Sequence, residues 1–217
     1  MSTFQRAGGS RRLAARFLLE LPRKTVFGES YHEAGCAMKS ECSKIVPAGY
    51  AIIPAESRHL PLLNAIELAA AKLFPDDYLP EHILSDKVPM DVLLDAQAQD
   101  MLWVAVDAGG SPVGYILVQA VDGLALLAQV DVHPDHGRQG LGTALIRHAM
   151  QAMHERGFAE CYLTTFSDIA WNAPFYAKLG FGVVGEADMP QAIAEILREE
   201  QERGLRNRVA MRLKISE

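Results

Sequence analysis

The chain has 217 residues, of which 49% are hydrophobic and 22% are charged. This composition is typical of a globular protein with one sizeable core. Its 27 acidic residues outnumber its 21 Lys and Arg residues, which gives a formal net charge of -6. Because an acidic surface repels phosphate backbones and attracts cations, this charge disfavours nucleic acid as a partner and favours a cationic one.

The cysteines and the apolar runs exclude further classes of protein. Cys36, Cys42 and Cys161 make no Cys-x-x-Cys pair, so we predict neither a disulfide framework nor a metal site. They fit a reducing compartment, and we expect a cytoplasmic protein. No apolar run reaches the roughly 18 residues that a membrane-spanning helix needs, so we expect a soluble protein with no membrane partner.

Residues 1–47 differ from the rest of the chain in charge. They carry eight Lys and Arg against four Asp and Glu, whereas residues 48–217 carry thirteen against twenty-three. Residues 1–19 contain four Arg, two Ser and no acid, which resembles a transit peptide. Two other interpretations stay open: a dispensable extension, with Met38 as an alternative start, and a basic arm that binds a partner. We predict a peripheral or disordered extension over 1–47 and one domain over 48–217.

The domain begins with a predicted strand and two helical regions. Residues 50–54 form a short apolar run that ends in proline and indicates a first strand. Apolar residues at helical spacing predict a helix over 56–74. Its inward face consists of Leu60, Leu63, Ile66, Ala70 and Leu73. Prolines and aspartates interrupt the pattern at 73–80, and a second helical region follows to residue 100.

The middle of the chain predicts an antiparallel meander followed by a long helix. Its three strands are 101–107, 113–121 and 124–132. Asp122-Gly123 is suited to the two-residue turn before the third strand, which Pro134 ends. An amphipathic helix is predicted over 139–156, with Gly157 at its end.

The last third of the chain alternates strands with helices. We predict strands at 158–165, 181–186 and 207–215, and a short helix at 171–179. A further helix has Asp188 as its predicted cap, Pro190 in its first turn and Gly204 at its end. Together these elements predict an α/β protein with a mixed sheet.

The most informative segment is 129–145, where a strand, a proline, a glycine-rich turn and a helix start follow one another. The backbone N–H groups from Arg138 to Thr143 would point out of the turn and the first helical turn, where the macrodipole is positive. Gly140 and Gly142 have no side chain, so a pyrophosphate can approach these amides closely. Arg138 can add a charge-assisted contact. The segment therefore predicts an anion-binding cradle.

Other glycine motifs fit this segment less well. A P-loop has Gly-Lys-Ser/Thr, but Gly142 is followed by Thr143 and Ala144. A dinucleotide fingerprint has glycine where this chain has Leu145. A glycine-rich turn that binds no ligand is the remaining alternative.

Two segments resemble the GNAT superfamily of N-acetyltransferases. Val132-His-Pro134 through Gly142 resembles the acetyl-CoA motif Val-x-Pro-x-x-[Gln/Arg]-x-x-Gly-x-Gly, with one departure: Gly137 stands at the Gln/Arg position and Arg138 follows it. The segment from Tyr176 to Phe181 resembles the family's Tyr-x-x-x-Gly-Phe. The resemblance implies a GNAT-like fold, whose central, mostly antiparallel twisted sheet is flanked by helices.

The resemblance also implies acetyl-CoA as the acetyl donor, without a metal. The residues that it assigns to the cofactor site are Val130, Val132, Arg138, Gln139, Gly140, Leu141, Gly142, Thr143, Asn172 and Tyr176. Asn172 lies four residues before the tyrosine, whereas the family's asparagine lies seven before it. Capping of the next helix is an alternative role for this residue.

For the reaction, the resemblance implies that an amine of a small molecule or peptide attacks the thioester directly. Tyr176 matches the family's general acid, and a phenol with a pKa near 10 stays protonated at neutral pH. Asp131 and His133 flank the cofactor strand and are the candidate bases. Further acidic and His residues lie on the segment that roofs the acceptor pocket in this family: Asp76, Asp77, Glu81 and His82.

A second function stays open beside the enzyme. The chain is alternatively a catalytically silent acyl-CoA-binding module whose basic N-terminal arm recruits a partner. Homodimers occur in the family, and the sequence leaves both the oligomeric state and the acceptor open.

Overall fold

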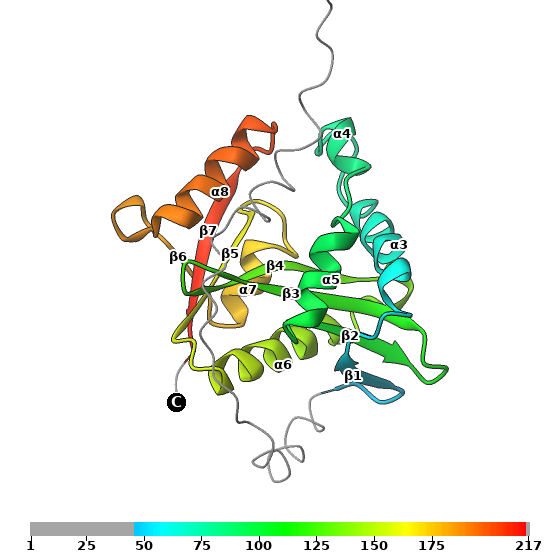
Figure 1. Cartoon of the computed structure of the whole chain (residues 1–217). Helices are drawn as coiled ribbons and strands as arrows, with labels where there is room; N and C mark the ends of the chain where they lie inside the picture. Colours follow the sequence, from blue (N-terminus) through cyan, green and yellow to red (C-terminus); the bar gives the residue numbers. More distant parts are fainter. Residues whose placement is uncertain (1–45, 216–217) are drawn as a thin grey trace, which may run out of the picture.

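A seven-stranded sheet runs through the protein in the order β1-β2-β3-β4-β5-β7-β6, with helices on both of its faces (Figure 1). The computed structural model describes residues 46–215. The strands are β1 (Tyr50–Pro54), β2 (Leu102–Asp107), β3 (Pro112–Val121), β4 (Leu124–Val132), β5 (Glu160–Phe166), β6 (Gly182–Val183) and β7 (Arg208–Lys214). All neighbouring strands are antiparallel except β4 and β5, which are parallel.

Six helices and two short 3-10 turns complete the described part of the chain. The helices are α3 (Leu60–Ala71), α4 (Glu81–Leu84), α5 (Met90–Ala98), α6 (Leu141–Glu155), α7 (Ala173–Lys178) and α8 (Gln191–Glu202), and the turns are η1 (Pro134–His136) and η2 (Glu186–Asp188). No helix within residues 46–215 is long and apolar enough to cross a membrane.

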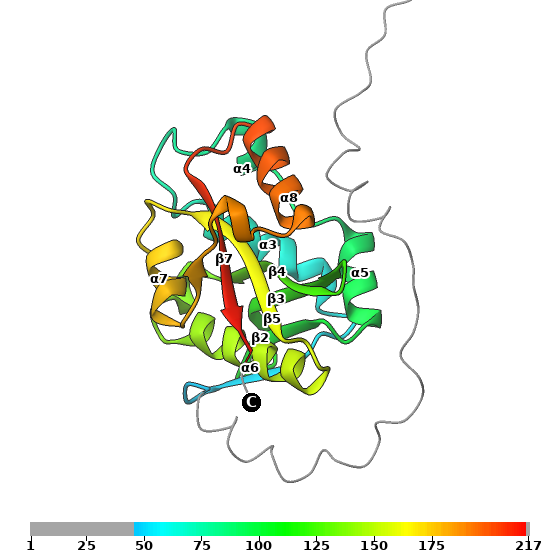
Figure 2. The same ribbon diagram turned by 90° about the vertical axis from the view of Figure 1, so that its left-hand side faces the viewer.

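The core has a separate cluster on each side of the sheet. Helices α3 and α5 pack their buried faces against one side of β2 and β3, where Tyr115 and Leu117 lie. Helix α6 packs against the other side, which holds Trp103 and Ile116. Helix α8 covers β4, β5 and β7 on the face opposite α6 (Figure 2). This layered arrangement of helices on a mixed sheet is the α/β architecture that the sequence predicts.

The predicted meander is confirmed, including its second turn. Strands β2, β3 and β4 pair in succession, and Val121 lies opposite Leu124 across the turn. Both turn residues have positive φ, 48° at Asp122 and 81° at Gly123. A two-residue hairpin turn of this kind needs positive φ at both positions, which Asp-Gly tolerates.

Two irregularities open the sheet at its centre. Leu117 pairs with Gln129 but Val118 pairs with Leu127, so Ala128 of β4 is left as a bulge. Strands β4 and β5 pair only at Ala125–Cys161 and Leu126–Tyr162. Beyond those pairs the two strands separate, and the gap lies between their carboxyl ends.

Several predicted boundaries shift for local reasons. Helix α3 begins at Leu60 instead of residue 56. Pro61 has no backbone N–H, so it fits the first turn of a helix but not its interior. Helix α6 begins at Leu141 because Gly140 has a φ of 88°. The predicted cap of α8 is wrong: Asp188 lies in η2, and Pro190 occupies the cap position without a side-chain hydrogen bond.

Two strands also differ from their predicted bounds. The strand predicted at 181–186 is reduced to the two residues of β6, and β5 starts two residues later than predicted. Most of the predicted N-terminal extension, with Cys36 and Cys42, lies outside the described residues.

Candidate active site

The turn before α6 presents a row of free backbone amides. Arg138 and Gly140 adopt left-handed conformations, with φ of 58° and 88°. The first backbone bond of the helix runs from the N–H of Ala144 to the carbonyl of Gly140. Within residues 46–215, no N–H group of residues 138–143 donates to another protein atom. These amides and the positive end of the helix dipole form a site suited to a phosphate group.

The side chains around this turn hold it in place and leave its outer surface open. Arg138 and Gln139 are exposed, whereas the Leu141 side chain is buried in the core. The Tyr50 hydroxyl donates to Gln139 Oε1 at 3.3 Å and lies 2.9 Å from His136 Nδ1. The turn is thereby attached to β1.

Helix α7 lies close to the first turn of α6. A Cβ atom added at Gly142 would lie 3.7 Å from Phe175 Cζ. Val130 and Val132 of β4, together with Phe175 and Tyr176 of α7, pack against the same core cluster as α6. The predicted cofactor residues of β4, α6 and α7 are therefore brought together around the gap between β4 and β5.

The Tyr176 hydroxyl lies between charges on the two sides of that gap. Burial raises its pKa above the ordinary value, the negative charge of Asp131 raises it further, and the positive charge of Arg208 opposes both effects. The hydroxyl is therefore protonated throughout the neutral range. A protonated phenol can donate a proton to a leaving group.

Asp131 lies near the end of β4 and is the predicted base that the structure places nearest to Tyr176. Burial raises its pKa to about 6, although hydrogen bonds from Gln129 and Tyr115 oppose this effect. Gln129 Nε2 donates to Asp131 Oδ2 at 2.6 Å. A carboxylate with a pKa just below neutral pH is ionised at pH 7 and accepts protons more readily than an ordinary aspartate.

Glu67 of α3 joins this cluster and was not predicted from the sequence. Its Oε2 accepts a hydrogen bond of 3.0 Å from the N–H of Val88 and one of 3.5 Å from the Tyr115 hydroxyl. Burial raises its pKa to about 7, and the charge of Asp131 contributes to this shift. A signal for it existed, because position 67 continues the helical spacing of Leu60 and Leu63 on the buried face.

His133, the second candidate base, is engaged in its own turn. It precedes η1, and its Nδ1 accepts a hydrogen bond of 3.3 Å from the N–H of Asp135. The Asp135 carboxylate lies 3.7 Å from the same nitrogen. No contact in the described residues joins His133 to Tyr176.

Asn172 occupies the cap position of α7, but its side chain makes no cap hydrogen bond, so the capping alternative is wrong. Its Oδ1 accepts a hydrogen bond of 2.8 Å from Thr165 Oγ1. Its Nδ2 is buried and has no partner in the described part of the chain. A buried donor without a partner is rare in proteins, so this Nδ2 is available to donate to a ligand.

Comparison with known proteins identifies the family. The model of the Acetyltransferase (GNAT) family matches residues 68–181, which are 114 of the 217 residues. The chain belongs to this family. The matched region contains the turn before α6, Asp131 and Tyr176.

Two GNAT relatives carry named activities. The [ribosomal protein bS18]-alanine N-acetyltransferase of Escherichia coli (strain K12) is 32% identical over 85 residues, or 39% of this chain and 57% of that enzyme. The match therefore spans little more than half of that relative's length. Spermidine N(1)-acetyltransferase of Thermoplasma acidophilum is 22% identical over 108 residues, or 50% of this chain and 67% of the relative.

A solved GNAT structure shows the same fold. It is the PaiA N-acetyltransferase from Thermoplasma acidophilum in complex with coenzyme A, which superposes with a TM-score of 0.56 at 19% identity. The superposition covers 76% of this chain and 98% of that one.

The segment between α3 and α5 crosses to the far half of the GNAT sheet. The Tyr78 hydroxyl donates to Asp168 Oδ1 at 2.6 Å, and Phe74 lies 5.4 Å from Phe166 between ring centroids. His82 Nε2 lies 3.1 Å from the carbonyl oxygen of Arg203. We refer to this segment, residues 72–89, as the roof. The predicted roof acids are exposed on its surface: Asp76, Asp77 and Glu81.

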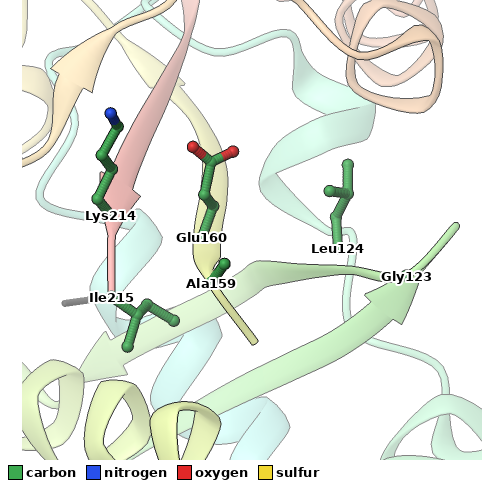
Figure 3. A pocket seen from close by; sticks show the side chains of 6 residues that line it. All are labelled: Gly123, Leu124, Ala159, Glu160, Lys214 and Ile215. Atoms are coloured by element: carbon green, nitrogen blue, oxygen red, sulfur yellow. The ribbon is translucent and has the colours of Figure 1, made fainter. Parts of the chain in front are cut away.

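A surface groove lies remote from this GNAT site. It is lined by six residues, shown in Figure 3: Gly123, Leu124, Ala159, Glu160, Lys214 and Ile215. These residues lie at the beginnings of β4 and β5 and at the end of β7, whereas the amide turn and Tyr176 follow the carboxyl ends of β4 and β5. The groove therefore plays no part in the candidate site.

Proposed function

We propose that this chain is an acetyl-CoA-dependent N-acetyltransferase in which an amine attacks the thioester directly. One observation carries the proposal. The free amides of residues 138–143, the protonated Tyr176 and the partly buried Asp131 lie around the gap that the separation of β4 from β5 opens in the sheet. An anion site, an acid and a base are the three groups that this reaction requires.

The residues around the gap fit coenzyme A. The amides of residues 138–143 would bind the pyrophosphate, with Arg138 as an additional cation. The unpartnered Nδ2 of Asn172 would donate to a carbonyl of the pantetheine arm. Bound in this way, acetyl-CoA supplies an acyl group activated as a thioester.

Asp131 would remove a proton from the amine, which must be neutral to attack the thioester. A primary amine with a pKa near 10.4 is cationic at pH 7, and its neutralisation costs about 4.6 kcal/mol. Asp131 attracts the ammonium group by its charge and then accepts its proton. Because the carboxylate is mostly desolvated, its interaction with the cation is stronger than it would be in water.

Tyr176 would supply a proton to the leaving sulfur. The departing thiolate of a thiol with a pKa near 8.5 must gain a proton, and the Tyr176 hydroxyl holds one at neutral pH. Transfer to the sulfur leaves a phenolate, which the positive charge of Arg208 stabilises. The phenolate then takes the second proton that the attacking nitrogen loses as the amide forms, which restores the Tyr176 hydroxyl.

The relatives support an amine acceptor without identifying it. The names of the two relatives specify an alanine of a ribosomal protein and spermidine. Both acceptors carry amino groups that are cationic at neutral pH. Their shared chemistry agrees with the acidic character of residues 48–217.

The test is an acetyl-transfer assay with purified full-length protein. Acetyl-CoA is incubated with a panel that includes spermidine and a peptide beginning with alanine, and products are detected by mass and by free thiol release. We expect one acetyl group on an amine and an equal amount of CoA. Failure of calorimetry to detect CoA binding to the folded protein would refute the proposal. CoA binding without transfer to any amine of the panel would favour the acyl-CoA-binding module.

A further inference from the structure

Three polar side chains lie in a row from the active-site gap to helix α3. Asp131 of β4 lies opposite Tyr115 of β3 in the strand register. The Tyr115 hydroxyl donates to Glu67 Oε2 at 3.5 Å, and it is near enough to Asp131 to stabilise the ionised carboxylate. Tyr115 is fully buried, with 0% of its surface exposed. The row therefore crosses the core beneath the gap.

Neither carboxylate of this row is neutralised by a cation. Within residues 46–215 neither Glu67 nor Asp131 forms an ion pair. The groups that act on Glu67 are Asp131 from β4, Tyr115 from β3, and Lys87 and the N–H of Val88 from the roof, and Lys87 has the smallest effect. Carboxylates that are partly buried without a counter-ion are costly to ionise, so they bind protons close to neutral pH.

Both carboxylates bind a proton close to neutral pH. Burial raises the pKa of Asp131 to about 6 and that of Glu67 to about 7. A proton can therefore pass from Asp131 to Glu67 without a large cost in free energy. Glu67 is only half-buried, and it borders the exposed Lys87 of the roof, so it can exchange its proton with solvent away from the gap.

We propose that Tyr115 and Glu67 form a relay that carries the amine's proton from Asp131 to solvent. The inference rests on the proposed function, in which Asp131 takes that proton. In the relay step, the Asp131 carboxyl group gives its proton to the Tyr115 oxygen as the Tyr115 hydroxyl gives its own to Glu67. Tyr115 ends the step unchanged, Asp131 is again a carboxylate, and Glu67 releases the proton to water.

A purely structural role for Glu67 is separable from the relay. Its Oε2 accepts the hydrogen bond from Val88 and so attaches the roof to α3. In Glu67→Gln the amide oxygen keeps this acceptor at the same place but binds no proton in the neutral range. Likewise Tyr115→Phe keeps the buried ring and removes only the hydroxyl.

The kinetic test measures kcat for the wild type, Glu67→Gln, Tyr115→Phe and the double variant, with spermidine and an alanyl peptide as acceptors. We expect each single variant to lower kcat on the order of ten-fold with the KM for acetyl-CoA unchanged. The double variant should be no slower than the slower single variant, because both changes interrupt one path. In Glu67→Gln the acid limb of the kcat profile should move to lower pH, because the group that titrates near pH 7 is removed.

A second tyrosine and carboxylate pair provides the matched control. The Tyr162 hydroxyl donates to Glu160 Oε2 at 2.7 Å, beside the remote groove of Figure 3. Tyr162→Phe and Glu160→Gln remove the same chemical groups as the test variants, and kcat should stay within two-fold of the wild type. Equal losses in the control and test variants would refute the relay, and so would losses in the test variants that simply add.

A measurement without any acceptor keeps the relay distinguishable from the proposed function. Carboxyl carbons are titrated by NMR in the wild type and in Glu67→Gln, and the signal absent from the variant is assigned to Glu67. Titration of that signal near pH 7 supports the relay, whereas titration near pH 4 refutes it even if the enzyme is active. If the wild type acetylates no amine at all, including both probes, the proposed function is refuted and the relay is refuted with it.

Discussion

Thr165 Oγ1 donates a hydrogen bond of 2.8 Å to Asn172 Oδ1 and orients the Asn172 amide in the turn before α7. Thr165 is buried, so this bond has no water to compete with it. The bond leaves the Asn172 Nδ2 buried without a partner, four residues before Tyr176. The Asn172 Nδ2 is therefore available to donate a hydrogen bond to an acceptor atom of a ligand.

Asn172→Ala should weaken CoA binding on the order of ten-fold, because the ligand carbonyl loses its donor. The free energy of unfolding should fall by about 1 to 3 kcal/mol, because the buried Thr165 hydroxyl loses its acceptor. Isothermal calorimetry with CoA and denaturant unfolding measure the two effects. Gln119→Ala is the control, because Gln119 also has a buried unpaired amide atom but lies in the half of β3 remote from the turn. Equal CoA affinity in both variants would contradict the role of Asn172.

Tyr176→Phe should lower kcat by about 10² or more while leaving the dissociation constant of CoA within two-fold. The reason is that the phenylalanine ring keeps the packing on Phe175 and Phe181 but has no proton to donate. Single-turnover acetylation and calorimetry separate the chemical step from binding. Wild-type turnover in this variant would exclude Tyr176 as the acid.

Gly142→Asp should abolish measurable CoA binding, whereas Gly142→Ala should weaken it only a few-fold. An added Cβ at this position lies 3.7 Å from Phe175, which is ordinary contact, so the alanine variant folds. The aspartate adds a negative charge in the first turn of α6, where the free amides would bind phosphate. Calorimetry compares the two variants, with thermal unfolding as the check on folding. Equal CoA binding by both variants would show that the phosphate does not bind at this turn.

The strands, their order along the chain and the amide turn could be predicted because their signals are local. Apolar runs, Asp122-Gly123 and the Pro134-to-Gly142 segment act over a few residues, and the structure keeps each of them within short shifts. The predicted start of α3 was wrong because two local signals disagree. The apolar pattern indicates a start at residue 56, whereas Pro61 in the first turn places the start at Leu60. Asp131 was identified from its nearness in sequence to the same turn.

The relay residues could not be predicted as a group because they come from three elements distant in sequence. Glu67 lies 48 residues before Tyr115, and only the packing of α3 on β3 and β4 brings Glu67, Tyr115 and Asp131 together. A helix pattern also treats a single acid on an apolar face as an exception rather than a site. His133 is the opposite case: its nearness to the turn made it a candidate, whereas in the structure its Nδ1 accepts a hydrogen bond from the N–H of Asp135.

The raised pKa of Glu67 should make folding depend on pH in a way that Glu67→Gln removes. Its pKa rises from 4.5 to about 7 on folding, so the folded state binds the proton more tightly than the unfolded state between these values. Stability contributed by this group is therefore present near pH 5 and declines as the pH rises through 7. Relative to the wild type, Glu67→Gln should be more stable at pH 8 than at pH 5. Urea unfolding at both values checks this, and an equal difference at the two pH values would contradict it.

Glu200→Gln should destabilise the protein by about 3 kcal/mol, because it leaves Arg208 charged and nearly buried. The Arg208 guanidinium donates to Glu200 at 2.7 and 2.8 Å, and the two side chains are 11% and 16% exposed. The same guanidinium lies 4.4 Å from the centroid of the Phe166 ring, so it cannot turn to solvent without losing this packing.

The control for this change lies on the same helix. Arg198 and Glu202 form an ion pair of 2.9 Å whose side chains are 60% and 64% exposed, and Glu202→Gln should cost less than about 0.5 kcal/mol. Urea unfolding of both variants gives the comparison. Similar losses would show that burial does not determine the strength of the Glu200–Arg208 pair. A large loss confined to Glu200→Gln would show that α8 holds the cation whose charge reaches Tyr176.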